Sequence, residues 1–174
     1  MELQLDQFVT LGSWTWLKFG ALVIAGRALD LGSTYAGTPN LLLEGSPLAR
    51  RMGWRLGIPL NLAAGLLSGC WPLLAIGLAT MSAFVAARNL QNAWIMRSMG
   101  EREYRTWMTR RLMDSPRWSP FACYFGEAAL SGIVALSLIV FAEYRLVPCG
   151  IGIGLLLYAL TIAFFTGVEL LRSR

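Results

Sequence analysis

Residues 72–96 read PLLAIGLATMSAFVAARNLQNAWIM, and this stretch decides the fold class of the chain. A helix of about 20 mostly apolar residues crosses the hydrocarbon core of a bilayer, and this stretch is longer and carries one ionisable residue, Arg88. The whole chain has the same character. Its 174 residues are 56% hydrophobic and 14% charged, with a mean hydropathy of +0.54. A soluble domain of this size is less apolar and more charged, so we expect one all-α integral membrane domain over residues 1–174.

Four further stretches are apolar enough to be transmembrane helices: about 14–36, 47–69, 120–142 and 148–171. Together with 72–96 they predict a polytopic transmembrane helical bundle of about five spans. Ser46 before Pro47 is a typical helix start, with the serine as N-cap and the proline in the first turn. Residues 47–58 contain three arginines and precede Pro59, so this part is expected either to span the membrane or to lie on its surface.

The arginines predict an orientation. Cytoplasmic segments are enriched in Lys and Arg, and here the arginines follow the first, third and fifth spans: Arg50, Arg51 and Arg55, then Arg97 to Arg117, then Arg172 and Arg174. The opposite side has only Lys18 and Arg145. We therefore expect the N-terminus outside, the C-terminus inside, and a bacterial cytoplasmic (inner) membrane location.

The segment 97–119, between the third and fourth spans, mixes arginines with Trp107, Met108 and Trp118. This amphipathic pattern predicts a cytoplasmic interfacial helix whose Trp and Met face lipid while its arginines meet anionic headgroups. The alternative is a solvated loop. Because a basic segment beside membrane spans is a topology signal, we do not expect nucleic-acid binding.

Ionisable residues within the apolar stretches are costly, so they need partners or a task. At a helical rise of ~1.5 Å per residue, Asp30, Arg88 and Glu127 lie at comparable depths, about 9 to 13 Å from the inner ends of their spans. Arg27 pairs either with Asp30 alone or within a four-residue network across helices, which we favour. The candidate polar pocket comprises Arg27, Asp30, Thr34, Arg88, Asn89, Asn92 and Glu127. Such a network either fixes helix register or binds an ion, a proton or an anionic headgroup.

Other candidate sites are weaker. Glu44, before the second span, interacts favourably with the helix dipole; alternatively Asp30, Glu44 and Ser33 form an oxygen-rich site for a hard cation. Cys70 and Cys149 lie on the predicted outer side, where a disulfide is permitted. Gly65-x-x-x-Gly69 and Gly150-x-x-x-Gly154 are typical of close helix packing, within the bundle or with a partner.

The chain has no histidine. The usual haem ligand, the usual imidazole metal ligand and the commonest general base are therefore missing. The three cysteines show no C-x-x-C spacing. We expect no metal or other cofactor, leave a bound lipid open, and assign no catalytic residue.

The pattern Asp30-x-x-Ser33-Thr34 followed by Glu44-x-Ser46-Pro47 resembles an uncharacterised family of small bacterial and archaeal multi-pass membrane proteins. In that family the motif is Asp-x-x-Thr-Thr, a short glycine-bearing loop, then Glu-x-Asn-Pro, so Ser33 and Ser46 depart from it. The resemblance covers the first two or three spans. It implies membrane location and singles out Asp30, Thr34 and Glu44, but it implies no reaction.

These observations favour a non-enzymatic membrane protein, most simply a subunit or assembly and scaffold component of a larger membrane complex. Its partners would be lipids and other membrane chains or a second copy of itself. The alternative is a small transporter that binds an ion or lipid headgroup in the Arg/Asp/Glu pocket. A single-chain alternating-access carrier is disfavoured, because no inverted repeat is evident.

Overall fold

The computed structural model describes residues 7–116 and 118–172, with the side chains of the last helix described up to Val168. The described residues form six helices and no strand, as the predicted all-α class requires. The helices are α1 (Trp14–Gly37), α2 (Pro47–Ser68), α3 (Pro72–Met99), α4 (Glu101–Asp114), α5 (Trp118–Val140) and α6 (Leu146–Arg172). Arg117, Arg174 and the side chain of Arg172, all used to predict the orientation, lie outside the described residues.

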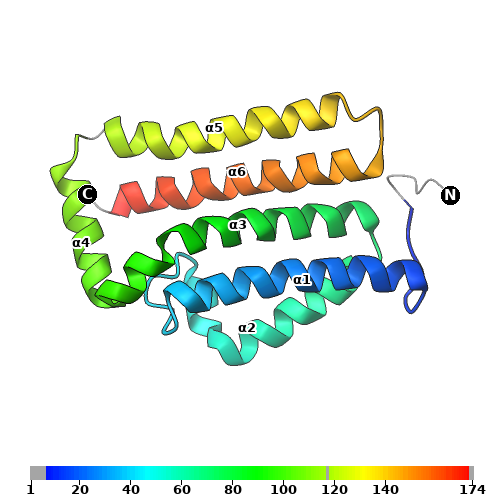
Figure 1. Ribbon diagram of the computed structural model, residues 1–174, viewed down its shortest axis with the longest axis horizontal. Helices are drawn as coiled ribbons and strands as arrows, with labels where there is room; N and C mark the ends of the chain where they lie inside the picture. Colours follow the sequence, from blue (N-terminus) through cyan, green and yellow to red (C-terminus); the bar gives the residue numbers. More distant parts are fainter. Residues whose placement is uncertain (1–6, 117, 173–174) are drawn as a thin grey trace.

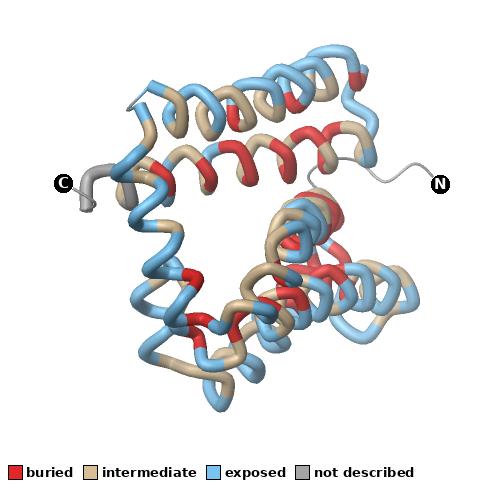
Figure 2. The backbone as a smooth tube through the Cα atoms, turned by 60° about the vertical axis from the view of Figure 1, so that its left-hand side comes forward, coloured by how far each residue is buried: buried red, intermediate tan, exposed pale blue. Residues whose placement is uncertain are grey.

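The long helices lie side by side in the order α5, α6, α3, α1, and α2 crosses the far side of α1 (Figure 1). The most extensive contacts are between α1 and α3, α5 and α6, and α3 and α6. The short helix α4 runs across one end and joins α3 to α5 (Figure 1). Buried residues concentrate on α6 and between α1 and α3, whereas α5 and α2 are largely exposed (Figure 2). The centre of the fold is therefore α3.

Three described helices are long and apolar enough to cross a membrane: α3, α5 and the Leu146–Val168 part of α6. This agrees with a membrane helical bundle. The helices α1 and α2 are long but do not reach the same apolar character, because α1 carries Lys18, Arg27 and Asp30, and α2 carries three arginines. Five spans and the N-out orientation therefore stay predictions.

A kink divides α2 into two parts. Gly53 has φ of 62°, a left-handed conformation that favours glycine, and it separates the basic first turn from residues 54–68. After the kink, the inward face is small or polar, with Asn61, Gly65 and Ser68. The outward face is apolar: Leu56, Leu60 and Leu67 are 53% to 61% exposed. This polarity is the reverse of a soluble helix and fits a lipid or protein environment around residues 54–68.

Both predicted small-residue motifs serve packing within the chain. A Cβ on Gly154 would lie 2.5 Å from the Gly77 carbonyl oxygen of α3, and one on Gly150 would lie 2.7 Å from Ile76 Cβ. A Cβ on Gly69 would lie 2.9 Å from the backbone nitrogen of Gly20 in α1. These glycines let backbones approach closely, as expected of membrane helices. These glycines therefore pack against other helices of the same chain.

The predicted helix at 97–119 exists, but it is shorter. Residues 97–99 continue α3, and α4 begins after Gly100, whose φ of 83° lets the chain turn sharply between the two helices. Ser115 and Pro116 follow the end of α4, and Trp118 and Ser119 already belong to α5. The prediction of a helix was correct and its bounds were wrong, since the helix-favourable composition of 97–119 is continuous across Gly100.

The predicted disulfide between Cys70 and Cys149 is absent, because both cysteines are free and buried. Cys70 lies in the turn between α2 and α3, where its carbonyl accepts a hydrogen bond from the Val9 N–H at 2.8 Å. Cys149 lies in the first turns of α6, on the other side of α3 (Figure 1). A shared predicted side of the membrane therefore did not bring the two cysteines into a disulfide.

Candidate functional site

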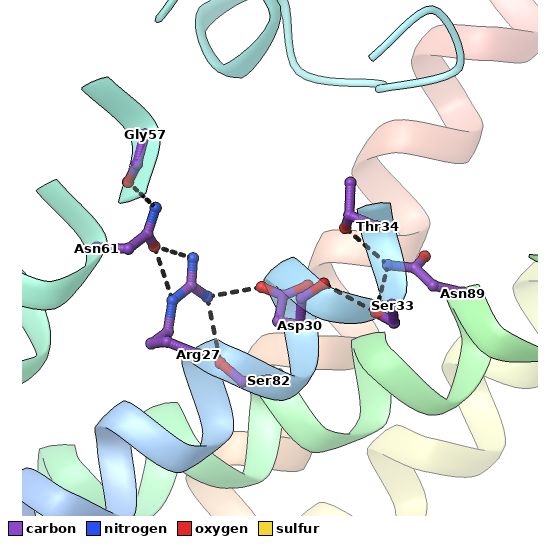
Figure 3. Close-up of polar contacts among 8 residues, drawn as sticks. All are labelled: Arg27, Asp30, Ser33, Thr34, Gly57, Asn61, Ser82 and Asn89. Atoms are coloured by element: carbon purple, nitrogen blue, oxygen red, sulfur yellow. Dashed lines mark hydrogen bonds and ion pairs between the residues drawn. The ribbon is translucent and has the colours of Figure 1, made fainter. Parts of the chain in front are cut away.

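Arg27 is the centre of a polar cluster where α1, α2 and α3 meet. Its Nη1 lies 2.8 Å from Asp30 Oδ2 on the same helix and 3.2 Å from Ser82 Oγ on α3. Its Nε donates to Asn61 Oδ1 of α2 at 2.8 Å, and Nη2 donates to the same oxygen. Figure 3 shows the guanidinium between Asn61 on one side and Asp30 and Ser82 on the other. The Arg27 and Asp30 side chains are 26% and 16% exposed.

Two features orient this cluster. Asn61 Nδ2 donates to the Gly57 carbonyl at 2.7 Å, which turns the side-chain oxygen of Asn61 toward Arg27. One helical turn beyond Asp30, Asn89 of α3 donates to Ser33 Oγ and Thr34 Oγ1 at 3.3 and 3.2 Å (Figure 3). The polar residues of α1 are therefore bonded to both neighbouring helices.

A second cluster lies where α3, α5 and α6 meet. Arg88 Nη1 is 2.9 Å from Glu127 Oε2, and the Tyr158 hydroxyl donates to Glu127 Oε1 at 2.7 Å. The Arg88 guanidinium also lies over the Tyr124 ring, 5.4 Å from its centroid. These contacts join α3, α5 and α6 next to the core residues Ala128, Tyr158 and Ile162.

The predicted four-residue network is therefore two separate ion pairs, Arg27–Asp30 and Arg88–Glu127. Among the described residues, no ion pair within 4.0 Å joins one to the other. The reason is that consecutive residues of a helix point in different directions. Asn89 of α3 faces α1, and the residue before it, Arg88, therefore faces α5. Asn92, also predicted for this pocket, is half-buried, and no described hydrogen bond of its side chain joins it to either cluster. The favoured four-residue network was therefore wrong, and the alternative pair of Arg27 with Asp30 is the one that forms. The equal depth of these residues in a membrane stays a prediction.

The three residues of the predicted cation site have separate partners. Asp30 pairs with Arg27, Ser33 Oγ donates to the Asp30 carbonyl at 2.8 Å, and Glu44 Oε1 accepts from the Ser46 N–H at 3.0 Å. Glu44 remains near enough for its charge to act on Asp30. Within the described part of the chain, no group of three Asp, Glu or Cys side chains is placed to hold a metal ion. Glu44 instead bonds to Ser46, the N-cap residue of α2. Its interaction with the helix dipole stays a prediction.

The best-defined polar site was missed by the sequence analysis, and we call it the Glu101 clamp. Glu101, the first residue of α4, is 9% exposed and accepts four hydrogen bonds from the α1–α2 loop. The donors are Thr38 Oγ1 at 2.6 Å, the Asn40 N–H and Nδ2 at 2.9 Å each, and the Leu42 N–H at 2.9 Å. Burial alone would raise the pKa of this carboxyl, but these hydrogen bonds outweigh it and lower the pKa below its ordinary value.

The Glu101 clamp fixes a strained loop. Leu41 has φ of 56°, a left-handed conformation that costs an ordinary residue about 1–2 kcal/mol. The N–H groups of Asn40 and Leu42, on the two sides of Leu41, both donate to Glu101. These hydrogen bonds hold Leu41 in its unfavourable conformation. From the other side, Trp54 Nε1 donates to the Pro39 carbonyl at 2.8 Å, and its ring packs edge-on against Tyr35. Helices α2 and α4 therefore both hold this loop.

The sequence contains only a partial signal for the Glu101 clamp. An acidic residue directly after a helix-breaking glycine suits the positive end of a helix. Thr38-Pro39-Asn40 is a typical turn sequence, and its Thr and Asn side chains can donate hydrogen bonds. Neither pattern says that the two segments, 59 to 63 residues apart, meet.

Over its described residues the chain is therefore helical, with three helices long and apolar enough to cross a membrane and with polar clusters on both sides of the central helix. No protein-family model, curated protein sequence or solved structure matches the chain.

Proposed function

We propose that the protein is a non-enzymatic subunit or scaffold of a larger complex in the bacterial cytoplasmic membrane, with about five spans and the N-terminus outside. The observation that carries this proposal is the uncovered apolar face of α2, formed by Leu56, Leu60 and Leu67. Among the described residues, helix α2 packs mainly against α1 and has few contacts with α3.

A protein neighbour suits this face better than lipid alone. After the kink, residues 54–68 rise only about 22 Å, so α2 crosses the ~30 Å hydrocarbon core only together with its basic first part. Arginine side chains within a span are costly against lipid tails. A neighbouring chain along this face would separate the basic first part of α2 from lipid.

The polar clusters support a structural role. Among the described residues, every buried side-chain nitrogen and oxygen has a hydrogen-bond partner within the chain. A satisfied intramembrane cluster fixes helix register, because any other register leaves charges unpaired in a medium where they are costly. Arg27 and Glu127 each join three helices in this way.

A photo-crosslinking amino acid placed at Leu60 tests the proposal in cells. We expect a discrete covalent adduct with a second polypeptide at Leu60. The matched control is Leu130 on α5, which is 68% exposed and should give lipid adducts only. Lipid adducts alone at both positions would contradict a protein neighbour at α2.

A second candidate function is ion or lipid-headgroup binding at the Arg27 cluster. The partial exposure of Arg27 and Asp30, with Glu44 close by, favours it. An Asp30→Asn variant that folds but loses a measured ion or lipid affinity would support it. Unchanged affinities for every ion and lipid tested, with the fold intact, would exclude it.

A further inference from the structure

The outward face of α4 has a hollow of about 310 Å³ that neither the two polar clusters nor the Glu101 clamp uses. That volume is at the lower end of the range for small-molecule sites. The hollow is lined by five residues of α4: Arg102, Glu103, Thr106, Trp107 and Arg110. Helical spacing explains the arrangement, since residues three, four, seven and eight apart share one face.

The opposite face of α4 is the one that packs against the protein. Tyr104 is 5% exposed and Glu101 is in the clamp, so the helix cannot rotate to bury the hollow. Helix α4 crosses the end of the bundle between α3 and α5 (Figure 1). A bilayer crossed by α3 and α5 would have headgroups at this end, so α4 would lie among them.

The lining residues carry both signs of charge. None of the three ion pairs of the described chain involves Arg102, Glu103 or Arg110. Trp107 is 38% exposed. The Trp107 ring contacts the Tyr104 ring, with 5.7 Å between the two centroids. The Arg111 Cζ lies 6.0 Å from the centroid of the Trp107 ring. The hollow therefore presents two cations, one anion and one aromatic ring to the same space.

We propose that this hollow binds the headgroup of a phospholipid that carries a phosphodiester and a primary ammonium group, as in phosphatidylethanolamine. Arg102 and Arg110 recognise the phosphate, for which guanidinium donors are well suited. The Glu103 carboxylate accepts hydrogen bonds from the ammonium group, and the neighbouring Trp107 ring attracts the same cation. Phosphatidylglycerol offers the same phosphodiester but no ammonium group, so it leaves the Glu103 carboxylate and the Trp107 ring without a cation.

Native mass spectrometry of the full chain tests this proposal. The protein is released from vesicles of equal parts phosphatidylethanolamine, phosphatidylglycerol and phosphatidylcholine, and the retained lipid is identified. We expect phosphatidylethanolamine to exceed each of the others by about threefold to fivefold, the size expected of one exposed charge pair. Glu103→Gln should abolish that preference, and Arg110→Gln should reduce retention of all three lipids.

Two matched variants keep the test specific. Arg105→Gln removes an exposed arginine that does not line the hollow, and Asp114→Asn removes an exposed acid beyond it. Both should retain lipid as the wild type does. The proposal is overturned if phosphatidylglycerol or phosphatidylcholine is retained as well as phosphatidylethanolamine, if Glu103→Gln has no effect, or if Arg105→Gln lowers retention as much as Arg110→Gln. A folded wild-type protein that retains no lipid would also overturn it.

Discussion

At the scale of single residues, Glu101 is the most fully hydrogen-bonded carboxylate of the described residues. A hydrogen bond to a charged group contributes about 1.5–3 kcal/mol to stability, and this carboxylate accepts four. Two of its donors are backbone N–H groups of a loop that contains the left-handed Leu41. Losing the acceptor would leave those groups unpaired beside a strained residue.

The first prediction concerns Glu101→Gln. The amide keeps the volume but turns an N–H₂ donor toward other donors, so we expect the free energy of unfolding to fall by about 1.5–3 kcal/mol. The measurement is thermal unfolding of the full chain in detergent, followed by circular dichroism. The control is Glu103→Gln, which is exposed and should change stability by no more than about 0.5 kcal/mol. Equal stability of the two variants would contradict the clamp.

The second prediction concerns pH. The pKa of Glu101 is lowered in the folded protein from an ordinary value of 4.5. The unfolded chain therefore binds the proton more readily, and the stability that the carboxylate contributes is complete above about pH 4.5. It is lost as the pH falls through the folded-state pKa. The stability difference between wild type and Glu101→Gln should accordingly shrink between about pH 7 and about pH 3. A constant difference over that range would show that the charge of Glu101 is not what stabilises the loop.

The residues of the candidate site were only partly predictable. Arg27, Asp30, Arg88 and Glu127 stand out because charges within apolar stretches are rare and costly. Their pairing depends on the rotation of α3 between two neighbours, which a single sequence does not specify. Glu101 could not be predicted, because its segment is rich in charged residues. The sequence does not distinguish one buried carboxylate from its exposed neighbours.

At the scale of helices, close backbone approach determines how α3 packs. Gly26 of α1 faces Ala79 of α3, and Gly154 of α6 faces Gly77 and Thr80 of α3. Since lipid tails are as apolar as leucine, such close packing supplies much of the association energy between membrane helices. The contact between α3 and α6 therefore depends on the absence of side chains at these positions.

The third prediction tests this contact with Gly154→Ala. The new Cβ would lie 2.5 Å from the Gly77 carbonyl oxygen, so the helices must separate. Overpacking of this kind costs about 1–3 kcal/mol, which thermal unfolding in detergent would detect. Gly132→Ala on α5 is the control, because its Cβ would have no neighbour within 4 Å. Higher helix propensity should leave that control unchanged or make it more stable by up to about 1 kcal/mol. A Gly154→Ala variant as stable as Gly132→Ala would contradict the packing.

The helices themselves were predicted well where the apolar stretch is long. The start of α2 at Ser46 and Pro47 was predicted from capping, and Ser46 Oγ does accept the Ala49 N–H, at 3.3 Å. The kink at Gly53 was not predicted, because Pro59 was the more prominent helix-breaking residue. The end of α3 was also missed, since nothing in the composition of Arg97 to Met99 differs from that of α4.

At the scale of the whole molecule, the end that carries α4 has many exposed arginines, whereas Arg145 lies at the opposite end. The positive-inside rule assigns the α4 end to the cytoplasm. The fourth prediction follows from this asymmetry. In a Cys123→Ser background, an impermeant maleimide should label Arg145→Cys in cells with a permeable outer membrane, and should label Arg105→Cys only after lysis. Labelling of Arg105→Cys before lysis, with Arg145→Cys protected, would reverse the proposed orientation.

We propose that this small helical bundle works as part of a larger membrane assembly, with the outward face of α2 against another chain. The most direct test is the composition of the particle extracted from native membrane by a lipid-retaining copolymer, without detergent. We predict a particle that contains the 19.2 kDa chain with a second polypeptide in fixed ratio, or with a second copy of itself. A particle that contains one copy of the chain and lipid alone would contradict the claim.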